Sequence, residues 1–133
     1  MADDFLDIIP VVPYADIRAG HDHLVDVLGF ASAGIVEHDG QVVHAEVRAG
    51  DRRLWLHAIG GGLTSPHAAG AATGGIVVQV ADVDAHFAAA KAKGATILRE
   101  PVDEPYGQRE YGVQDPEGHN WYFATPTAAP AAR

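Results

Sequence analysis

The side chains best suited to chemistry in this sequence of 133 residues are its eight histidines. We expect most of them to lie on the surface, solvated or hydrogen-bonded. His44 and His57 differ, because both lie in the middle of predicted strands, and Glu46 is close to His44 in the chain. Imidazole and carboxylate groups can bind a metal ion or transfer protons. If the chain has a catalytic or metal-binding set, His44, Glu46 and His57 are its best candidates.

Nucleophilic catalysis finds little support in the sequence. There is no cysteine, and the two serines, Ser32 and Ser65, do not lie in the glycine-flanked pattern of a nucleophile elbow. The absence of cysteine also excludes disulfide frameworks and metal sites built on thiolates. We therefore predict no nucleophile of the serine or cysteine type.

The charge balance excludes two classes of partner. Eighteen acidic residues against nine Lys and Arg give a net charge of −9. Nucleic acids and anionic membranes would be repelled by such a surface, because both are bound through Lys and Arg. No apolar run approaches the ~20 residues that a membrane span needs, and the acidic first residues are unlike a signal peptide. We expect a cytoplasmic protein that binds neither nucleic acid nor membrane.

Two stretches of the chain follow the same pattern of predicted elements. In each, a β-branched strand leads to an aspartate that begins a helix, Asp16 in the first and Asp82 in the second, and a glycine ends the helix. Three extended segments follow each helix, so each stretch is predicted to be a β-α-β-β-β unit. Pro10 and Pro13 interrupt the first strand. Proline lacks a backbone donor, so this strand is expected either at the edge of a sheet or with its N–H groups facing outward.

We predict one domain, residues 1–133, made of two such modules at about 6–59 and 75–125. A glycine-rich linker, 60–74, joins the modules, and an Ala/Pro tail, 127–133, is expected to be disordered. Each module alone is too small to bury an adequate core. The two are therefore expected to pair their sheets around one curved surface.

Three segments carry a resemblance to a known family. They are GIVVQVADVDA at 75–85, YGQREY at 106–111 and QDPEGHNW at 114–121. With the duplicated unit, they resemble the vicinal oxygen chelate superfamily, which includes glyoxalase I, extradiol dioxygenases, epimerases and bleomycin-resistance-type proteins. The resemblance implies an α+β, glyoxalase-like fold in which two tandem βαβββ modules form a curved mixed sheet around a cup-shaped pocket.

The resemblance also identifies the positions at which metal-dependent members of this superfamily place His or Glu ligands. By offset from the motifs, these positions are Ile9, Trp55, Gly75 and Tyr122. None is a good metal ligand, and shifting each position by one residue gives no better set. We therefore predict a protein without a metal or other cofactor.

A pocket built at these positions would be apolar and aromatic. Gly75 would deepen it, Trp55 and Tyr122 would offer flat rings for stacking, and Gln79 would supply a hydrogen bond. The predicted ligand-binding residues are Ile9, His44, Trp55, His57, Gly75, Gln79, Tyr106, Arg109, Tyr111 and Tyr122. Trp121 and Phe123 have the opposite strand parity to Tyr122 and are predicted to be core. Alternatively, Trp55 and Tyr122 fill the cup as core themselves.

The favoured function is that of a metal-independent binding protein of the antibiotic-resistance type. It would sequester an aromatic or planar small molecule, with a preference for cations because of its negative charge. The resemblance implies a homodimer. One alternative is a metal-dependent lyase, isomerase or dioxygenase that resembles glyoxalase I and uses His44, Glu46 and His57. Another is a vestigial interaction domain with a filled pocket.

Overall fold

The computed structural model describes residues 2–128 of the chain. The tail predicted for 127–133 therefore lies, from residue 129 onward, outside the described residues. The first module contains β1 (Val11–Tyr14), α1 (Ile17–Asp26), β2 (Ala31–His38), β3 (Gln41–Ala49) and β4 (Arg52–Ala58). The second contains β5 (Gly75–Gln79), α3 (Val83–Ala92), β6 (Thr96–Glu104), β7 (Gln108–Gln114) and β8 (Asn120–Pro126). A short 3-10 turn (Ala2–Asp4) precedes them, and α2 (Pro66–Ala69) lies in the linker.

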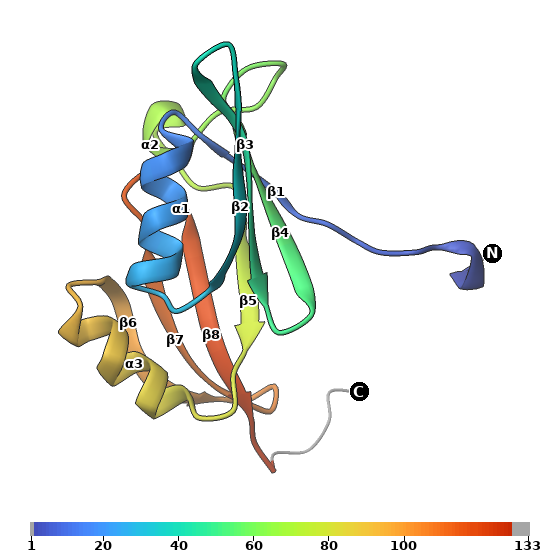
Figure 1. The fold of residues 1–133 in the computed structure, drawn as a ribbon. Helices are drawn as coiled ribbons and strands as arrows, with labels where there is room; N and C mark the ends of the chain where they lie inside the picture. Colours follow the sequence, from blue (N-terminus) through green and yellow to red (C-terminus); the bar gives the residue numbers. More distant parts are fainter. Residues whose placement is uncertain (1, 129–133) are drawn as a thin grey trace.

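The two modules have the same sheet topology. The strand orders are β1-β4-β3-β2 and β5-β8-β7-β6, and in each sheet the first strand runs parallel to its neighbour while the other pairs are antiparallel. The α+β fold of two tandem βαβββ modules is thus confirmed (Figure 1). The strand that contains Pro13 is an edge strand, as its missing donor requires.

Both helices begin in the same way. The side chains of Asp16 and Asp82 each accept a hydrogen bond at 3.0 Å from a backbone N–H three residues later, that of Ala19 in α1 and Ala85 in α3. Both aspartates have extended backbone angles, as an N-cap residue should. The repeated aspartate therefore marks a repeated structural feature.

One face of each sheet is covered by its own helix, and the other face is open. Alternate residues of β3 and β4, among them Val47 and Leu56, are buried on the side of α1. In the second module, Trp121 and Phe123 are buried in the same continuous core, as predicted from their parity. Phe30, which precedes β2, packs against both at ring-centroid distances of 5.5 and 6.0 Å. We call the uncovered side of each sheet its open face.

Hydrogen bonds also join the modules. The buried Asp115 carboxylate accepts the Tyr14 hydroxyl of β1 at 2.6 Å and the Trp121 indole N–H at 3.1 Å. His86 of α3 contacts the Tyr111 hydroxyl at 2.6 Å and the Leu28 carbonyl of the first module at 2.8 Å. The relative position of the two modules is thus fixed by directional bonds as well as by apolar packing.

The chain before β1 points away from the body of the molecule (Figure 1). It carries the apolar side chains Phe5, Leu6 and Ile8, and Leu6 is 99% exposed. No helix within residues 2–128 has both the length and the apolar character that crossing a membrane requires.

Candidate functional site

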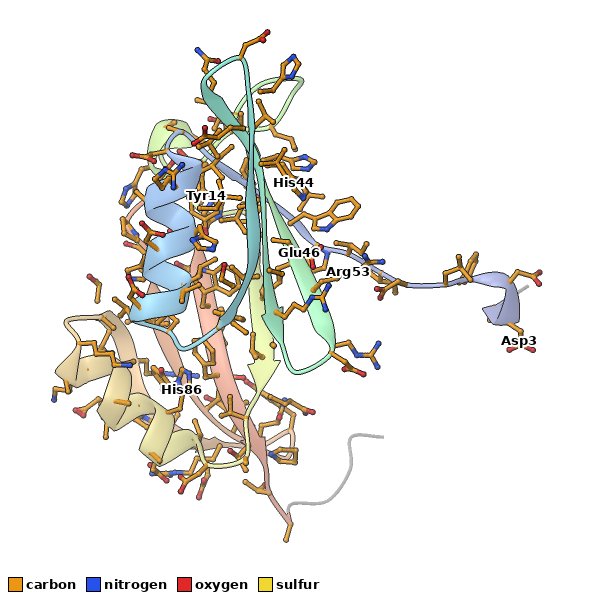
Figure 2. All side chains as sticks on the ribbon, viewed as in Figure 1. Asp3, Tyr14, His44, Glu46, Arg53 and His86 are labelled. Carbon is orange, nitrogen blue, oxygen red and sulfur yellow. The ribbon has the colours of Figure 1, made fainter. Side chains whose placement is uncertain are left out.

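Three rings gather on the open face of the first module. His44 of β3 lies directly opposite His57 of β4, and Trp55 is on the same face because it is two residues from His57. The centroids of the two imidazoles are 5.0 Å apart, and the Trp55 centroid is 5.3 Å from His44 and 6.1 Å from His57. Figure 2 shows His44 on the side of the sheet away from α1. The structure therefore brings together three of the predicted ligand-binding residues.

Glu46 holds the Trp55 side chain. Its carboxylate accepts the indole N–H at 2.9 Å and the Nε–H of Arg48 at 2.9 Å. The hydrogen bond from Trp55, followed by the one from Arg48, lowers the pKa of the Glu46 carboxyl. Arg53 lies over the same indole, 5.8 Å from its centroid. Glu46 is therefore an ionised group that positions an aromatic ring.

The set His44, Glu46 and His57 shares one face, but its members do not converge. Glu46 is engaged by Trp55 and Arg48, whereas the imidazoles contact each other. Within residues 2–128 no group of three or more His, Asp or Glu side chains is arranged to hold a metal ion. Burial, and then the neighbouring His57, lowers the pKa of His44 against the opposing effect of Glu46, so His44 is neutral at pH 7.

The open face of the second module has a different surface. The ring of Tyr122 lies over two glycines, because a Cβ atom on Gly75 would be 2.6 Å from Tyr122 Cε2 and one on Gly112 would be 3.1 Å from Tyr122 Cε1. Gly75 therefore does not open space on this face. The space that glycine leaves is filled by the Tyr122 ring.

Two other predicted residues on this open face form polar contacts. Gln79 donates to the side-chain oxygen of Gln108 at 3.0 Å. The Tyr106 hydroxyl donates at 3.0 Å to Glu110, which is only 6% exposed and also receives Arg99 at 3.2 Å. The Gln79 amide nitrogen and the Tyr106 hydroxyl on the predicted face are thus already engaged by other side chains.

Arg109 and Tyr111 are not on this face, which corrects the expectation that they reach into the pocket. Arg109 forms an ion pair with Asp84 of α3 at 3.0 Å, and Tyr111 is fully buried against His86 and Phe123. Successive side chains of a strand point to opposite faces. Since Gly112 pairs with Tyr122 on the open face, its neighbour Tyr111 must face the core. The register between β7 and β8, which strand parity alone does not give, therefore decides where both residues point.

A cavity of about 440 Å³ lies between β1 and β5 beneath the linker. Its lining includes Val11, Pro13, Leu63, Ser65, Thr73, Gly75, His119 and Asn120. A second hollow of about 380 Å³ is lined by Phe30, Arg48, Gln79, His86 and Phe123, among others. Neither is lined by Trp55 or Tyr122, and Ile9 lies before β1 outside both. Sequence reasoning missed Val11, which pairs with Trp55, and the linker residues over the first cavity.

Comparisons with known proteins agree with this architecture. A family model described as the Glyoxalase/Bleomycin resistance protein/Dioxygenase superfamily matches residues 10–123. Uncharacterised proteins of Mycobacterium bovis and Mycobacterium tuberculosis are 33% identical over 93 residues, 66% of this chain. The match covers 61% and 55% of those proteins, so the chain spans less than two thirds of the curated relatives it matches.

Solved structures with the same fold include two that are more than 25% identical to this chain. TioX from Micromonospora sp. ML1 is 32% identical with a TM-score of 0.76, covering 92% of this chain and 99% of TioX. The bleomycin-binding protein of Streptomyces verticillus, solved with copper(II)-bleomycin, is 27% identical with a TM-score of 0.67, covering 96% and 98%. TnmS3, an antibiotic binding protein from Streptomyces sp. CB03234, is 19% identical with a TM-score of 0.72, covering 93% and 98%, and shows the fold.

Proposed function

The chain belongs to the glyoxalase/bleomycin resistance protein/dioxygenase superfamily, and from this premise we propose that it sequesters an aromatic or planar small molecule without a resident metal. The observation that carries the proposal is the ring cluster of His44, Trp55 and His57 on the open face of the first module. Glu46 fixes the indole of Trp55 by a hydrogen bond. A ring held in place before the ligand arrives loses little freedom on binding, which favours affinity.

The residues at the family's metal positions do not fit a metal ion. Ile9 has a hydrocarbon side chain and Gly75 has none, while the indole nitrogen of Trp55 is a donor only. Tyr122 alone has an oxygen atom, and its ring lies over Gly75 and Gly112. One phenol cannot replace the three or four ligands of a metal centre. This composition supports binding that does not depend on a metal at those positions.

Two observations support the class of ligand. The bleomycin-binding protein, 27% identical to this chain over nearly its whole length, binds an antibiotic. The net charge of −9 attracts cations over long range, an effect that salt weakens. The ligand of this chain would accordingly be a planar or aromatic compound of the antibiotic kind, with cationic members of that class bound faster.

The binding unit would be a homodimer. Trp55 and Tyr122 lie on open faces and line neither of the two large cavities of the single chain, so a second copy is needed to enclose a ligand against them. The exposed apolar side chains of the N-terminal arm, residues 5–8, offer a surface that such a copy would cover. Sedimentation of the full chain, with and without residues 2–8, tests this assembly.

The experiment that tests the function compares ligand binding by Trp55→Ala with that of the parent protein. A thermal-shift screen of planar aromatic antibiotics, run with and without chelator, first selects a ligand. Loss of stacking and of buried area in Trp55→Ala should then weaken that ligand at least tenfold in calorimetric titration, since truncating an aromatic hot-spot residue costs about 2 kcal/mol or more and about 1.4 kcal/mol is tenfold.

Two further variants serve as controls. Trp55→Phe keeps a ring and should retain most of the affinity, and Val102→Ala, which alters an exposed side chain of β6 in the second module, should leave it unchanged. Unaltered affinity in a folded Trp55→Ala protein would show that the ligand does not stack on Trp55. If no compound shifts the melting temperature, the vestigial alternative with a filled pocket is favoured.

A further inference from the structure

A serine, a histidine and an aspartate are joined by hydrogen bonds where α1 packs against β2 (Figure 1). Nε2 of His21 is 2.7 Å from the hydroxyl oxygen of Ser32, and Nδ1 of the same ring is 2.9 Å from a carboxylate oxygen of Asp22. Within residues 2–128, no other imidazole contacts both a carboxylate and a serine or threonine hydroxyl. Both distances lie in the range of about 2.6–3.2 Å that joins a nucleophile, its base and the group that orients the base.

The partners of His21 determine which of its nitrogen atoms carries the proton. An ionised carboxylate can only accept hydrogen bonds, so the contact with Asp22 requires a proton on Nδ1. In the neutral ring Nε2 is then an acceptor, and the Ser32 hydroxyl donates to it. This is the tautomer in which a histidine can take the proton of a serine nucleophile.

The base and the hydroxyl group differ in their exposure. His21 is only 7% exposed, whereas Ser32 is exposed. The base is therefore largely shielded from water, while a molecule from outside can reach the serine. β2 is an edge strand, and a register shift between Ser32 and Ile35 interrupts its pairing with β3. Irregularities of this kind re-aim side chains and are frequent next to active sites.

A backbone donor lies beside the same hydroxyl oxygen. The N–H of Gly34 is 3.4 Å from Ser32 Oγ, which is a long and therefore weak contact. Gly34 has a φ of 117°, a conformation that favours glycine. This weakly held N–H can instead bind the oxygen atom on which negative charge develops when Ser32 attacks a carbonyl group.

We propose that Ser32, His21 and Asp22 hydrolyse small activated esters, an activity that is independent of the proposed sequestration. Ser32 is the nucleophile, His21 the general base, and Asp22 a positioning residue that holds the imidazole ring. Ser32 lines neither of the two large cavities, so the substrates are small esters with a good leaving group. The prediction that the chain has no serine nucleophile rested on a local motif, whereas this set joins a helix to a strand.

The reaction proceeds by acyl transfer to the serine and then to water. Oγ of Ser32 bonds to the carbonyl carbon while its proton passes to Nε2 of His21. The bond from that carbon to the leaving oxygen breaks, and His21 gives the proton to the departing alcohol or phenol. Water then attacks the acyl-serine with His21 as base, which releases a carboxylic acid and restores the hydroxyl of Ser32.

Diisopropyl fluorophosphate tests the nucleophile in the full chain. Oγ of Ser32 would form a bond to phosphorus, fluoride would leave, and His21 would take the proton. Peptide mass mapping should find the reagent on Ser32 and not on Ser65, whose hydroxyl caps α2 and which is only 3% exposed. His21→Gln should slow the labelling of Ser32 at least tenfold, because general-base catalysis contributes about 10²–10⁴-fold.

Hydrolysis of p-nitrophenyl acetate tests turnover. The rate per chain should fall at least tenfold in Ser32→Ala, which retains all eight histidines and therefore the same background hydrolysis by imidazole. Thr96→Ala, which removes an exposed hydroxyl from β6, is the matched control and should leave the rate unchanged. Asp22→Asn should lower kcat and leave KM unchanged, a separation that a general loss of structure would not produce.

Two results would overturn the proposal. One is a Ser32 that the fluorophosphate does not label, and the other is equal hydrolysis by the parent protein and Ser32→Ala. Because Ser32 is exposed, its replacement by alanine should not prevent folding. The comparison with Ser32→Ala therefore decides the question even if His21→Gln, at a buried position, fails to fold.

Discussion

On the first open face, His44, Trp55 and His57 lie within about 6 Å of one another by ring centroid, and their outer surfaces are available to a ligand. On the second, the Tyr122 ring is folded down over Gly75 and Gly112. Both faces belong to sheets with the same strand order. The shared strand order therefore determines the direction in which the side chains of each sheet point. The residues at a few positions determine whether an open face is available to a ligand or is covered by its own side chains.

The helix-covered sides differ as well. The fourth residue after the N-cap is Gly20 in α1, and a Cβ atom there would be 2.6 Å from Tyr14 Cδ1. The equivalent residue in α3 is His86, whose ring stacks on that of Phe123 with a centroid distance of 4.0 Å. The glycine gives Tyr14 room to reach Asp115 across the module boundary. The histidine instead reaches Leu28 from the opposite side of that boundary. Tyr14 and His86 thus each bind a group of the other module.

The largest effect is expected when Asp115, the centre of the contact between the modules, is replaced by alanine. The carboxylate accepts four donors, namely the Tyr14 hydroxyl, the Trp121 indole and the backbone N–H groups of Glu117 and His119. Burial raises the pKa of the Tyr14 hydroxyl, so Tyr14 remains a donor. With these donors left without an acceptor, Asp115→Ala should lower the free energy of unfolding by about 3–5 kcal/mol in urea denaturation.

Asp51→Ala is the matched control, because Asp51 lies exposed in the turn between β3 and β4. It should change the free energy of unfolding by less than about 0.5 kcal/mol. A loss for Asp115→Ala no greater than that of the control would show that the hydrogen bonds of the Asp115 carboxylate do not stabilise the contact between the modules.

The second open face is tested by Gly75→Ala. Its new Cβ would be 2.6 Å from Tyr122 Cε2, so the ring must move, and we expect a loss of about 1–3 kcal/mol in the free energy of unfolding. Gly74→Ala is the matched control, since no atom lies within 4 Å of its Cβ position. Adding Tyr122→Ala to Gly75→Ala should remove most of the clash. Equal stability of the Gly74 and Gly75 variants would mean that Tyr122 does not occupy this space.

The features of the fold that repeat could be predicted from the sequence. Asp16 and Asp82 begin helices by the same local hydrogen bond, and Pro13 restricts its strand to an edge, so each signal depends on few neighbouring residues. The prediction that Trp121 and Phe123 are core residues, based on their strand parity relative to Tyr122, is confirmed by their burial. These predictions succeeded because backbone geometry and strand alternation are local properties.

The site was less predictable, because it depends on contacts across strands. The bond from Trp55 to Glu46 follows from the register between β3 and β4, and the position of the Tyr122 ring follows from glycines on two other strands. Neither register could be read from one strand. The face of Tyr111 likewise follows from the register between β7 and β8, which pairs it with Phe123 in the core.

The response to pH should separate the partly buried His86 of the second module from exposed histidines. Burial lowers the pKa of His86, while its bond to the Leu28 carbonyl opposes this. The unfolded chain then binds a proton more readily than the folded chain below about pH 6.5, so stability must fall as the pH decreases from that value. One such group contributes at most about 1.4 kcal/mol per pH unit.

We therefore expect the free energy of unfolding to fall less steeply between pH 7 and pH 5.5 in His86→Gln than in the parent protein. His23 and His44, whose pKa values burial also lowers, should account for part of the remaining slope. His38→Gln is the control, because its side chain is exposed. Identical slopes for the parent and His86→Gln would contradict the assignment of this pH dependence to the boundary between the modules.

The smallest predicted effects are those of Asp16→Ala and Asp82→Ala, and the comparison depends on their being alike. Each variant removes one N-cap hydrogen bond of 3.0 Å and should cost about 1 kcal/mol in urea denaturation. Glu117 of the second module also binds the backbone N–H of Asp16, at 2.9 Å, but that bond does not use the Asp16 side chain. If Asp16→Ala proves far more costly than Asp82→Ala, the first cap is coupled to the boundary between the modules. Near-equal costs would instead mean that the two N-caps contribute equally to stability, so that the modules differ in the side chains of their open faces and not in the start of their helices.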